Sequence, residues 1–315
     1  MNRVSSRPSQ RVKLASVIRS ISDGEFHRFQ TLIQKETGIH LIAEKRDLLV
    51  GRLSKRLREL GVETFGEYYR LVADGGDREE RQRMIDLVST NETRFFREPA
   101  HFEFLSQVLS AWREEAEAGK RPHRVRIWSA ACSSGEEPYS LAMSLRDHFP
   151  VSSGWSLEIV ASDVSMRVLD RAKSAVYPLE RVSELSPEQQ KAYLLRGVAS
   201  QAGKVRIAPE IRGMVQFLQV NLIDDAYPVA GQFDLIFCRN VFIYFEAATK
   251  SRAVEKLLRH LVPSGYLFLG RSETLHGIST RVRVVQPAIY TFADAPRSSL
   301  SPRSSLSPRE SRRPR

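Results

Sequence analysis

From residue 124 to about residue 292, strand-like apolar runs alternate with helical segments, and this alternation limits the fold more than any other feature of the sequence. Alternating strands and helices build a mostly parallel sheet with helices on both faces, so we expect a doubly wound α/β domain. In such sheets ligands bind beyond the carboxyl ends of the strands, and the function should therefore lie in the turns that follow them. Strands are predicted at 125–129, 157–162, 215–220, 234–238, 266–270 and about 288–292, with helices at about 100–118, from 138, from 164 and over 247–261.

The preceding segment, residues 23–91, shows only helical periodicity. Apolar side chains recur at spacings of three and four, and no strand-like alternation interrupts them. Gly38 and Gly61 follow the first two periodic stretches, in the position of helix-ending residues. Two more helices are expected at 65–72 and 81–88, which gives a small helical domain of roughly 70 residues. The apolar positions that define the first two helices are Phe26, Phe29 and Ile33, then Leu49, Leu53, Leu57 and Leu60.

The net charge of +11 over 315 residues would suggest a nucleic-acid partner, but its placement does not. Residues 1–20 hold five basic and no acidic side chains, and residues 296–315 hold six arginines and one glutamate. The remaining 21–295 carry 37 basic and 36 acidic residues and are nearly neutral. Both tails are rich in Ser and Arg and poor in apolar residues, so we expect them to be disordered and expect no nucleic-acid partner.

Other function classes are disfavoured by what the sequence lacks. The longest unbroken apolar run, 241–245, has five residues, whereas a membrane-spanning helix needs about 20. No secretory signal is evident, so we expect a soluble cytoplasmic protein without membrane insertion. Cys132 and Cys238 show no disulfide or zinc-site spacing, and the seven histidines show no metal-ligand spacing. We expect two buried thiols and no metal.

The turn after the first predicted strand, residues 129–135, consists of small residues and contains a single glycine, Gly135. A dinucleotide site would show a glycine-rich pattern here and would place pyrophosphate at the positive end of the next helix. Glu136 and Glu137 put negative charge at that position, which argues against NAD or ATP. A cationic ligand, such as a sulfonium that carries an amino-acid group, fits better. The alternative is that both are ordinary first-turn acids of a helix.

Polar residues also follow the next three strands. Asp163 comes after the second strand, where an acid can accept hydrogen bonds from ribose hydroxyls, although it could instead cap the next helix. Asn221 and Leu222 follow the strand at 215–220, and Arg239 and Asn240 follow the strand at 234–238. Because four strands deliver polar groups to one edge of the sheet, a nucleoside site is favoured there.

Four segments carry a family resemblance. Residues 91–99 (NETRFFREP), 128–140 (WSAACSSGEEPYS), 161–165 (ASDVS) and 237–245 (FCRNVFIYF) resemble the chemotaxis-receptor glutamate O-methyltransferases of the CheR type. The resemblance runs from about residue 25 to 293. It implies a receptor-docking helical domain (21–92) followed by an S-adenosylmethionine-binding methyltransferase domain (93–295). It also implies a small antiparallel β-subdomain inserted at about 178–220.

The same resemblance implies the site residues. Arg97 and Tyr244 fall on the family's proposed catalytic pair. From the residues alone, the apolar run 241–245 instead favours a hydrophobic packing role for Tyr244. The cofactor is S-adenosyl-L-methionine and the product S-adenosyl-L-homocysteine. The implied cofactor contacts are Asn91, Thr93, Arg97, Glu136, Asp163, Asn221, Leu222, Arg239 and Asn240.

The implied partner is the cytoplasmic helical region of chemoreceptors. We expect this protein to act as a cytoplasmic monomer that is recruited to receptor arrays at the inner face of the membrane. Four basic residues fall within an arc of about 100° around one predicted helix. Such a stripe suits docking to glutamate-bearing helices, although it is usually just a solvent-exposed face. The strands expected at 204–207 and 215–218 could form a hairpin for a receptor tether. Two other functions stay open, a nucleic-acid methyltransferase and a catalytically silent cofactor-binding scaffold. The stripe consists of Lys45, Arg52, Lys55 and Arg56.

Overall fold

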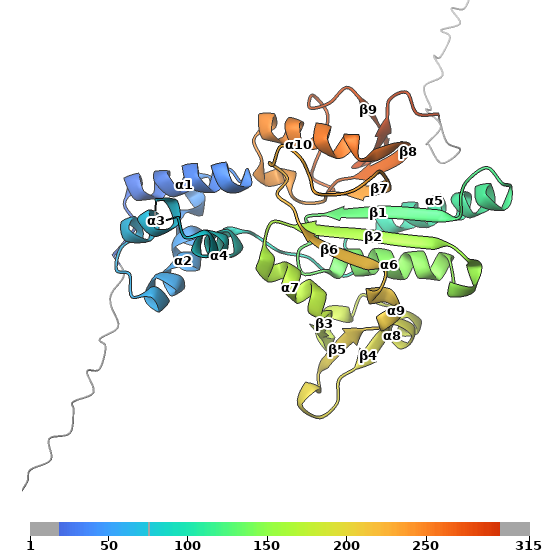
Figure 1. The fold of residues 1–315 in the computed structure, drawn as a ribbon, viewed down its shortest axis with the longest axis horizontal. Helices are drawn as coiled ribbons and strands as arrows, with labels where there is room; N and C mark the ends of the chain where they lie inside the picture. Colours follow the sequence, from blue (N-terminus) through green and yellow to red (C-terminus); the bar gives the residue numbers. More distant parts are fainter. Residues whose placement is uncertain (1–18, 75, 297–315) are drawn as a thin grey trace, which may run out of the picture. The chain divides into compact units, whose positions relative to one another are not determined.

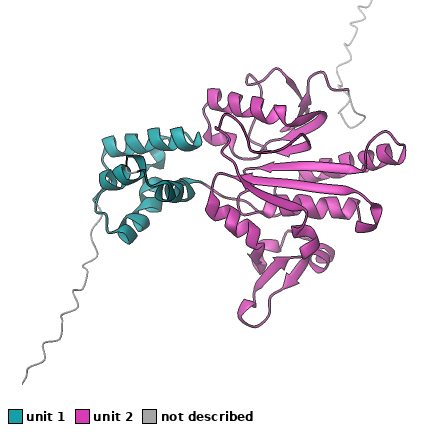
Figure 2. Cartoon of the chain, viewed as in Figure 1, with its two compact units in different colours: residues 1–89 teal, residues 90–315 magenta. Residues whose placement is uncertain are grey.

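The computed structural model describes residues 19–74 and 76–296, and the chain divides into two compact units, 1–89 and 90–315 (Figure 2). The two tails expected to be disordered, 1–20 and 296–315, lie almost entirely outside the described residues. None of the helices in the described part of the chain combines the length and the apolar character that crossing a membrane requires.

The first unit is entirely helical in its described part, as the periodicity predicts. Reciprocal hydrogen bonds between Ser22 and Glu25 begin the first helix, and Thr64 with Glu67 begins the third in the same way. Gly61 ends the second helix in the left-handed conformation. The elements are α1 (Asp23–Thr37), η1 (Ala43–Lys45), α2 (Arg46–Leu60), α3 (Phe65–Ala73) and α4 (Arg78–Val88).

A buried ion pair joins α2 to α4. The Glu80 side chain is 4% exposed and accepts hydrogen bonds from Arg56 Nε at 2.9 Å and from the Tyr68 hydroxyl at 2.9 Å. Burial, followed by the Glu80 charge, raises the pKa of Tyr68. Arg56, a member of the predicted basic stripe, thus neutralises Glu80 inside the unit, and its role in docking stays a prediction. Arg52 is also engaged, since its Nη1 donates to the carbonyl of Val88.

Replacing Arg56 should therefore destabilise the first unit. Arg56→Met leaves Glu80 buried without its cation, which should lower the stability of α2 and α4 by about 3 kcal/mol. Lys55→Met is the matched control, because the Lys55 side chain is 83% exposed and should contribute less than about 0.5 kcal/mol. Native-state hydrogen exchange of α2 and α4 amides in the full chain measures both. Equal losses of protection in the two variants would contradict this assignment.

The second unit contains a seven-stranded, mostly parallel sheet in the order β6-β2-β1-β7-β8-β10-β9 (Figure 1). The strand β10 runs antiparallel to its two neighbours, β8 and β9, so β9 again has the direction of β8. The strands are β1 (Arg124–Ala130), β2 (Ser156–Asp163), β6 (Val215–Gln219), β7 (Phe233–Phe237), β8 (Leu261–Phe268), β9 (Val282–Gln286) and β10 (Ile289–Phe292). The helices are α5 (Pro99–Glu117), α6 (Glu136–His148), α7 (Met166–Ser174) and α10 (Ala247–Arg259), with short turns η2 (Val151–Ser153) and η5 (Phe242–Tyr244).

Alternate residues of the central strands supply two apolar cores, one on each face. Ile127 and Phe237 pack in the core that includes α5 and α6. Their neighbours Trp128 and Cys238 pack in the core that includes α10. Because successive side chains of a strand point to opposite faces, strands buried on both faces appear as continuous apolar runs. The doubly wound α/β prediction is confirmed.

The direction in which the chain adds strands reverses between β1 and β7. From β1 the chain proceeds to β2 and β6 on one side, and β7 leads to β8 on the other. At such a switch point, the crossing helices diverge and leave a crevice at the carboxyl ends of the two central strands. The strand β9 was not anticipated, and β8 begins at Leu261 rather than at 266.

A second, three-stranded antiparallel sheet is inserted between α7 and β6, which confirms the expected small β-subdomain. Its order is β3-β5-β4. The expected hairpin between 204–207 and 215–218 is wrong, because β5 pairs with β3 and β4 whereas β6 runs parallel to β2 in the main sheet. The helix that begins at Pro209 redirects the chain between them. The elements here are β3 (Val176–Pro178), η3 (Leu179–Val182), α8 (Pro187–Tyr193), β4 (Leu194–Arg196), η4 (Ala199–Gln201), β5 (Lys204–Ile207) and α9 (Pro209–Arg212).

Candidate active site at the switch point

The turn between β1 and α6 has a strained backbone. Ala131, Ser133 and Gly135 all take positive φ, at 64°, 50° and 97°. Non-glycine residues rarely adopt this region, and strain of this kind is concentrated at functional sites. A Cβ on Gly135 would lie 2.8 Å from the Tyr177 hydroxyl and 2.9 Å from Ala172 Cβ, so only glycine fits. The turn is thereby packed closely against α7, through Ala172, and against the inserted strand that carries Tyr177.

Glu136, the first residue of α6, is completely buried. Its Oε2 accepts a hydrogen bond from Ser134 Oγ at 2.7 Å, while its Oε1 is buried without a hydrogen-bond partner among the described residues. The donor Asn91 Nδ2 is likewise buried without a hydrogen-bond partner among the described residues. Asn91 lies beside the turn, because its backbone carbonyl accepts a hydrogen bond from Ser133 Oγ at 2.9 Å. A ligand with a cationic ammonium and a carboxylate would satisfy both atoms. The amino-acid end of S-adenosylmethionine therefore fits the residues present.

Asp163 ends β2 beside this turn and is 5% exposed. Its Oδ2 accepts from the Ser133 backbone N–H, and its Oδ1 accepts from the Ser165 N–H, each at 2.9 Å. The cap of α7 is Ser165, whose hydroxyl accepts from the backbone N–H of Val168, so the helix-cap alternative for Asp163 is wrong. The side chain instead connects the carboxyl end of β2 to the first turn.

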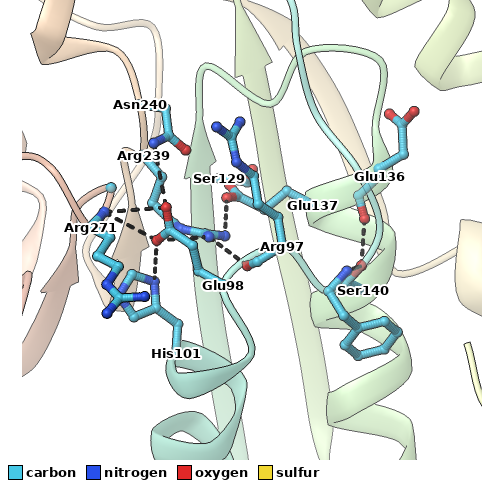
Figure 3. Close-up of polar contacts among 12 residues, drawn as sticks. Arg97, Glu98, His101, Ser129, Glu136, Glu137, Ser140, Arg239, Asn240 and Arg271 are labelled. Carbon is cyan, nitrogen blue, oxygen red and sulfur yellow. Dashed lines mark hydrogen bonds and ion pairs between the residues drawn. The ribbon is translucent and has the colours of Figure 1, made fainter. Parts of the chain in front are cut away.

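Arg239, just beyond β7, joins three segments of this edge (Figure 3). Its side chain is 2% exposed; Nη1 lies 2.9 Å from a Glu137 oxygen and Nη2 lies 3.1 Å from a Glu98 oxygen. Nη2 also donates to the carbonyl of Arg97 at 2.5 Å. Glu137 further accepts from Ser129 Oγ at 2.7 Å. The structure thus gives the Arg239 guanidinium an internal, positioning role, and its contact with a cofactor stays a prediction.

Glu98 stands at the centre of a second set of contacts. It has a φ of 61° and precedes α5, and its carboxylate accepts from the Arg271 backbone N–H at 3.2 Å. Although burial opposes ionisation, the Arg239 charge and the Arg271 N–H lower the pKa of Glu98. Burial, followed by the same Arg239 charge, lowers the pKa of His101 to about 4, so its ring is neutral at physiological pH. The cluster therefore pairs one arginine with two carboxylates.

The other predicted residues lie along the same edge. Asn240 has a φ of 60°, and its Nδ2 lies 3.4 Å from Glu98 Oε1. Asn221 follows β6, where its Oδ1 accepts from the Ile223 N–H, and Leu222 is buried. Val220 N–H donates to the Asp163 carbonyl, which fixes this segment beside β2. The structure therefore gathers residues from β1, β2, β6 and β7 as expected.

The two residues of the implied catalytic pair lie on segments that Arg239 helps to join. Arg97 is half-buried, and its Nη1 donates to the carbonyl of Glu92 at 2.8 Å. Tyr244 is half-buried at the end of η5, so it is not the fully buried plug that the apolar run alone suggests. Cys132 and Cys238 are buried free thiols, as expected, and burial raises the pKa of both.

The inserted subdomain also contacts this site. The Tyr177 hydroxyl, from β3, donates to the Ser134 carbonyl at 2.7 Å. Arg181, from η3, donates to the Thr93 carbonyl at 3.0 Å. Both bonds support segments that were predicted to contact the cofactor. Sequence reasoning missed these two residues, Glu98, and the pairing of Glu137 with Arg239, because contacts between distant polar groups leave no local signal.

The doubly wound sheet, the acidic switch-point turn and the unpartnered Glu136 oxygen define the class as an S-adenosylmethionine-dependent methyltransferase. Residues 91–291 match the model "CheR methyltransferase, SAM binding domain", and residues 24–89 match "CheR methyltransferase, all-alpha domain". The chain belongs to the CheR methyltransferase family.

Curated relatives span nearly the same length. Chemotaxis protein methyltransferases of Salmonella typhimurium and Escherichia coli are each 38% identical over 275 residues, which is 87% of this chain and 92% of theirs. Chemotaxis protein methyltransferase 2 of Pseudomonas aeruginosa is 40% identical over 85% of this chain and 92% of its own. Among solved structures, a glycopeptide N-methyltransferase covers 56% of this chain and 58% of its own at 15% identity and a TM-score of 0.30, a likeness too weak to inform the fold.

The bond from Tyr177 to the first turn should matter for cofactor affinity. Tyr177→Phe leaves the buried Ser134 carbonyl without its donor, which should weaken binding of S-adenosyl-L-homocysteine about tenfold. Tyr193→Phe is the matched control, because that hydroxyl joins the same subdomain to Asp147 at the far end of α6. Calorimetric titration measures both affinities. The same loss of affinity in both variants would show general loosening rather than support of the turn.

Proposed function

We propose that this chain transfers the methyl group of S-adenosylmethionine to glutamate side chains of chemoreceptors, with glutamate methyl esters and S-adenosyl-L-homocysteine as products. Family membership over both units supports the reaction, and the names of the relatives support a role in chemotaxis. The observation that carries the proposal at the site is the completely buried Glu136 with one unpartnered oxygen, which suits a cationic cofactor.

Esterification of a glutamate needs little proton chemistry from the protein. With a reference pKa of about 4.3, the acceptor carboxylate is already ionised at neutral pH and needs no general base. Bound S-adenosylmethionine supplies an electrophilic methyl group on a sulfonium. The chain must orient the carboxylate in line with that group and exclude water. We assign orientation and electrostatic control to Arg97 and Tyr244.

The proposed cofactor contacts remain the nine predicted residues, with different kinds of support. Glu136 and Asn91 are supported by buried atoms without partners, and Asp163 by its position between β2 and the first turn. Arg239 contributes by holding together α6 and the segment before α5 that contains Glu98. The remaining contacts are Thr93, Arg97, Asn221, Leu222 and Asn240, which lie on the same sheet edge or on the segment before α5.

Incubation with methyl-labelled cofactor and receptor-bearing membranes tests the reaction. We expect label in receptor protein that mild base releases as methanol, as a carboxyl methyl ester requires. Tyr244→Phe should lower the rate at least tenfold and leave S-adenosyl-L-homocysteine binding unchanged, since it removes the hydroxyl to which we assign orientation of the acceptor carboxylate. Base-stable label in nucleic acid would contradict the proposal, and so would cofactor binding without any transfer.

We propose that the first unit docks the receptor through the exposed members of the basic stripe, Lys45 and Lys55. Both are exposed, and Ile42 and Leu48 are exposed apolar residues near Lys45 in the sequence. Arg52 and Arg56 are engaged within the unit, so changing them would disturb its packing as well as its charge. Long-range attraction to glutamate-bearing helices would raise the association rate. We further propose that residues 21–92 form the docking domain and that residues 93–295 form the catalytic domain. We propose that the protein acts as a monomer at the cytoplasmic face of receptor arrays.

Charge reversal on this surface should therefore slow receptor methylation. Lys45→Glu/Lys55→Glu should raise the apparent KM for receptor several-fold at low salt, with a smaller effect at high salt because ions screen exposed charges. Lys120→Glu/Lys173→Glu makes the same change in net charge on exposed residues of the second unit and serves as the control. Cofactor affinity should be unchanged in both. Equal KM values for the two double variants would rule out this docking surface.

A further inference from the structure

The loop after β7, residues 239–244, carries Arg239, Asn240 and Tyr244 and needs a means of holding its shape. Asn240 takes a left-handed φ of 60°, and η5 then turns the chain so that Phe242 is buried while Ile243 is 52% exposed. A short, strained loop of this kind persists only where its surroundings fix it.

The group that fixes this loop is the carboxylate of Glu273, which is 5% exposed and lies in the turn after β8. Its Oε2 accepts from the backbone N–H of Asn240 at 2.9 Å and of Gly270 at 2.6 Å. Its Oε1 accepts from the N–H of Ile243 at 3.2 Å. One side chain thus satisfies two donors of the β7 loop and one donor beyond β8.

Close packing shows that the loop and the end of β8 are fitted to each other. A Cβ on Gly270 would lie 2.4 Å from Asn240 Nδ2 and 2.8 Å from its backbone nitrogen. Glu98 holds the same asparagine from the other side, through Nδ2 at 3.4 Å. The Asn240 side chain therefore has an anchor that is independent of Glu273, whereas the N–H of Ile243, adjacent to Tyr244, is held by Glu273.

We propose that Glu273 is a positioning residue for methyl transfer, because its carboxylate fixes the backbone of residues 240–243 and so the placement of Tyr244. The inference rests on the proposed role of Tyr244 in the reaction. Burial raises the pKa of Glu273, although the backbone N–H groups oppose the shift. Burying a carboxylate costs free energy unless hydrogen bonds such as those from these N–H groups compensate for the lost solvation.

The test is Glu273→Gln in the full-length enzyme. A carboxamide of nearly the same shape can serve either the Asn240 and Gly270 donors or the Ile243 donor with its oxygen, and its NH2 group faces whichever N–H remains. We expect kcat to fall roughly ten- to hundredfold, while the KM for S-adenosylmethionine changes less than about threefold. We also expect faster hydrogen exchange of the amides of Asn240 and Ile243.

Asp234→Asn is the matched control. Asp234 is a buried carboxylate near the opposite end of β7, where it accepts from the Arg126 backbone N–H at 2.8 Å and pairs with Arg121. This variant should lose stability without changing kcat or exchange in the loop. If Glu273→Gln does not fold, Glu273→Asp keeps the buried charge but is too short to reach both donors of the loop, and the same losses are expected.

Each result separates this inference from the proposed function. If the wild-type enzyme does not methylate receptors, the proposed function is wrong. In that case hydrogen exchange still tests the inference: unchanged exchange of the Asn240 and Ile243 amides in the Glu273 variants would overturn the positioning role. An active wild-type enzyme with unchanged kcat in Glu273→Gln overturns the inference alone. An equal fall in kcat for Asp234→Asn also overturns it, because that result would reduce the effect to lost stability.

Discussion

The interaction on which the rest of the site depends is the buried contact of Arg239 with Glu98 and Glu137. These three side chains come from the end of β7, the segment before α5 and the start of α6, and their contact joins the three segments. Buried charges of this kind gain little net stability, because desolvation offsets their attraction. Removing one member is nevertheless severe, because it leaves its partners buried and unpaired. The contact therefore fixes geometry more than it adds stability, as a site at a strand switch point requires.

The same contact determines the charge that remains for a ligand. Glu136 and Glu137 are adjacent in sequence, but successive residues of a helix point about 100° apart. Glu137 turns toward Arg239 and is neutralised, whereas Glu136 has one oxygen without a partner among the described residues. The first turn thus presents one uncompensated carboxylate rather than two. One negative charge is what a ligand with a single ammonium group at that position would complement.

The sequence was sufficient to predict the elements and the edge of the sheet at which the site lies, since both follow from local periodicity and from the order of strands. It placed Asp163, Asn221 and Arg239 at that edge correctly. It could not show that Arg56 neutralises a buried glutamate 24 residues away, or that β5 pairs with β3 and β4 rather than with β6. Those outcomes depend on pairings between distant segments, for which a single sequence carries no periodic signal. The role of Glu273 was hidden for the same reason, because its partners are backbone N–H groups that any residue at those positions would supply.

Three carboxylates at this edge make the same kind of contact, a hydrogen bond accepted from the backbone of another loop. Asp163, Glu98 and Glu273 each accept backbone N–H groups from a neighbouring loop, and two of those loops contain non-glycine residues with positive φ. Asp163 accepts two backbone donors and Glu273 accepts three, and a carboxylate held in this way permits its loop few conformations. Methyl transfer needs in-line alignment more than it needs acid–base groups, and misplacement by about 1 Å can cost two orders of magnitude in rate. The inserted subdomain adds hydrogen bonds of the opposite kind, in which side chains donate to backbone carbonyls. Tyr177 donates to a carbonyl of the first turn, and Arg181 donates to a carbonyl of the segment before α5. The insertion is therefore part of the active-site scaffold, whatever else it binds.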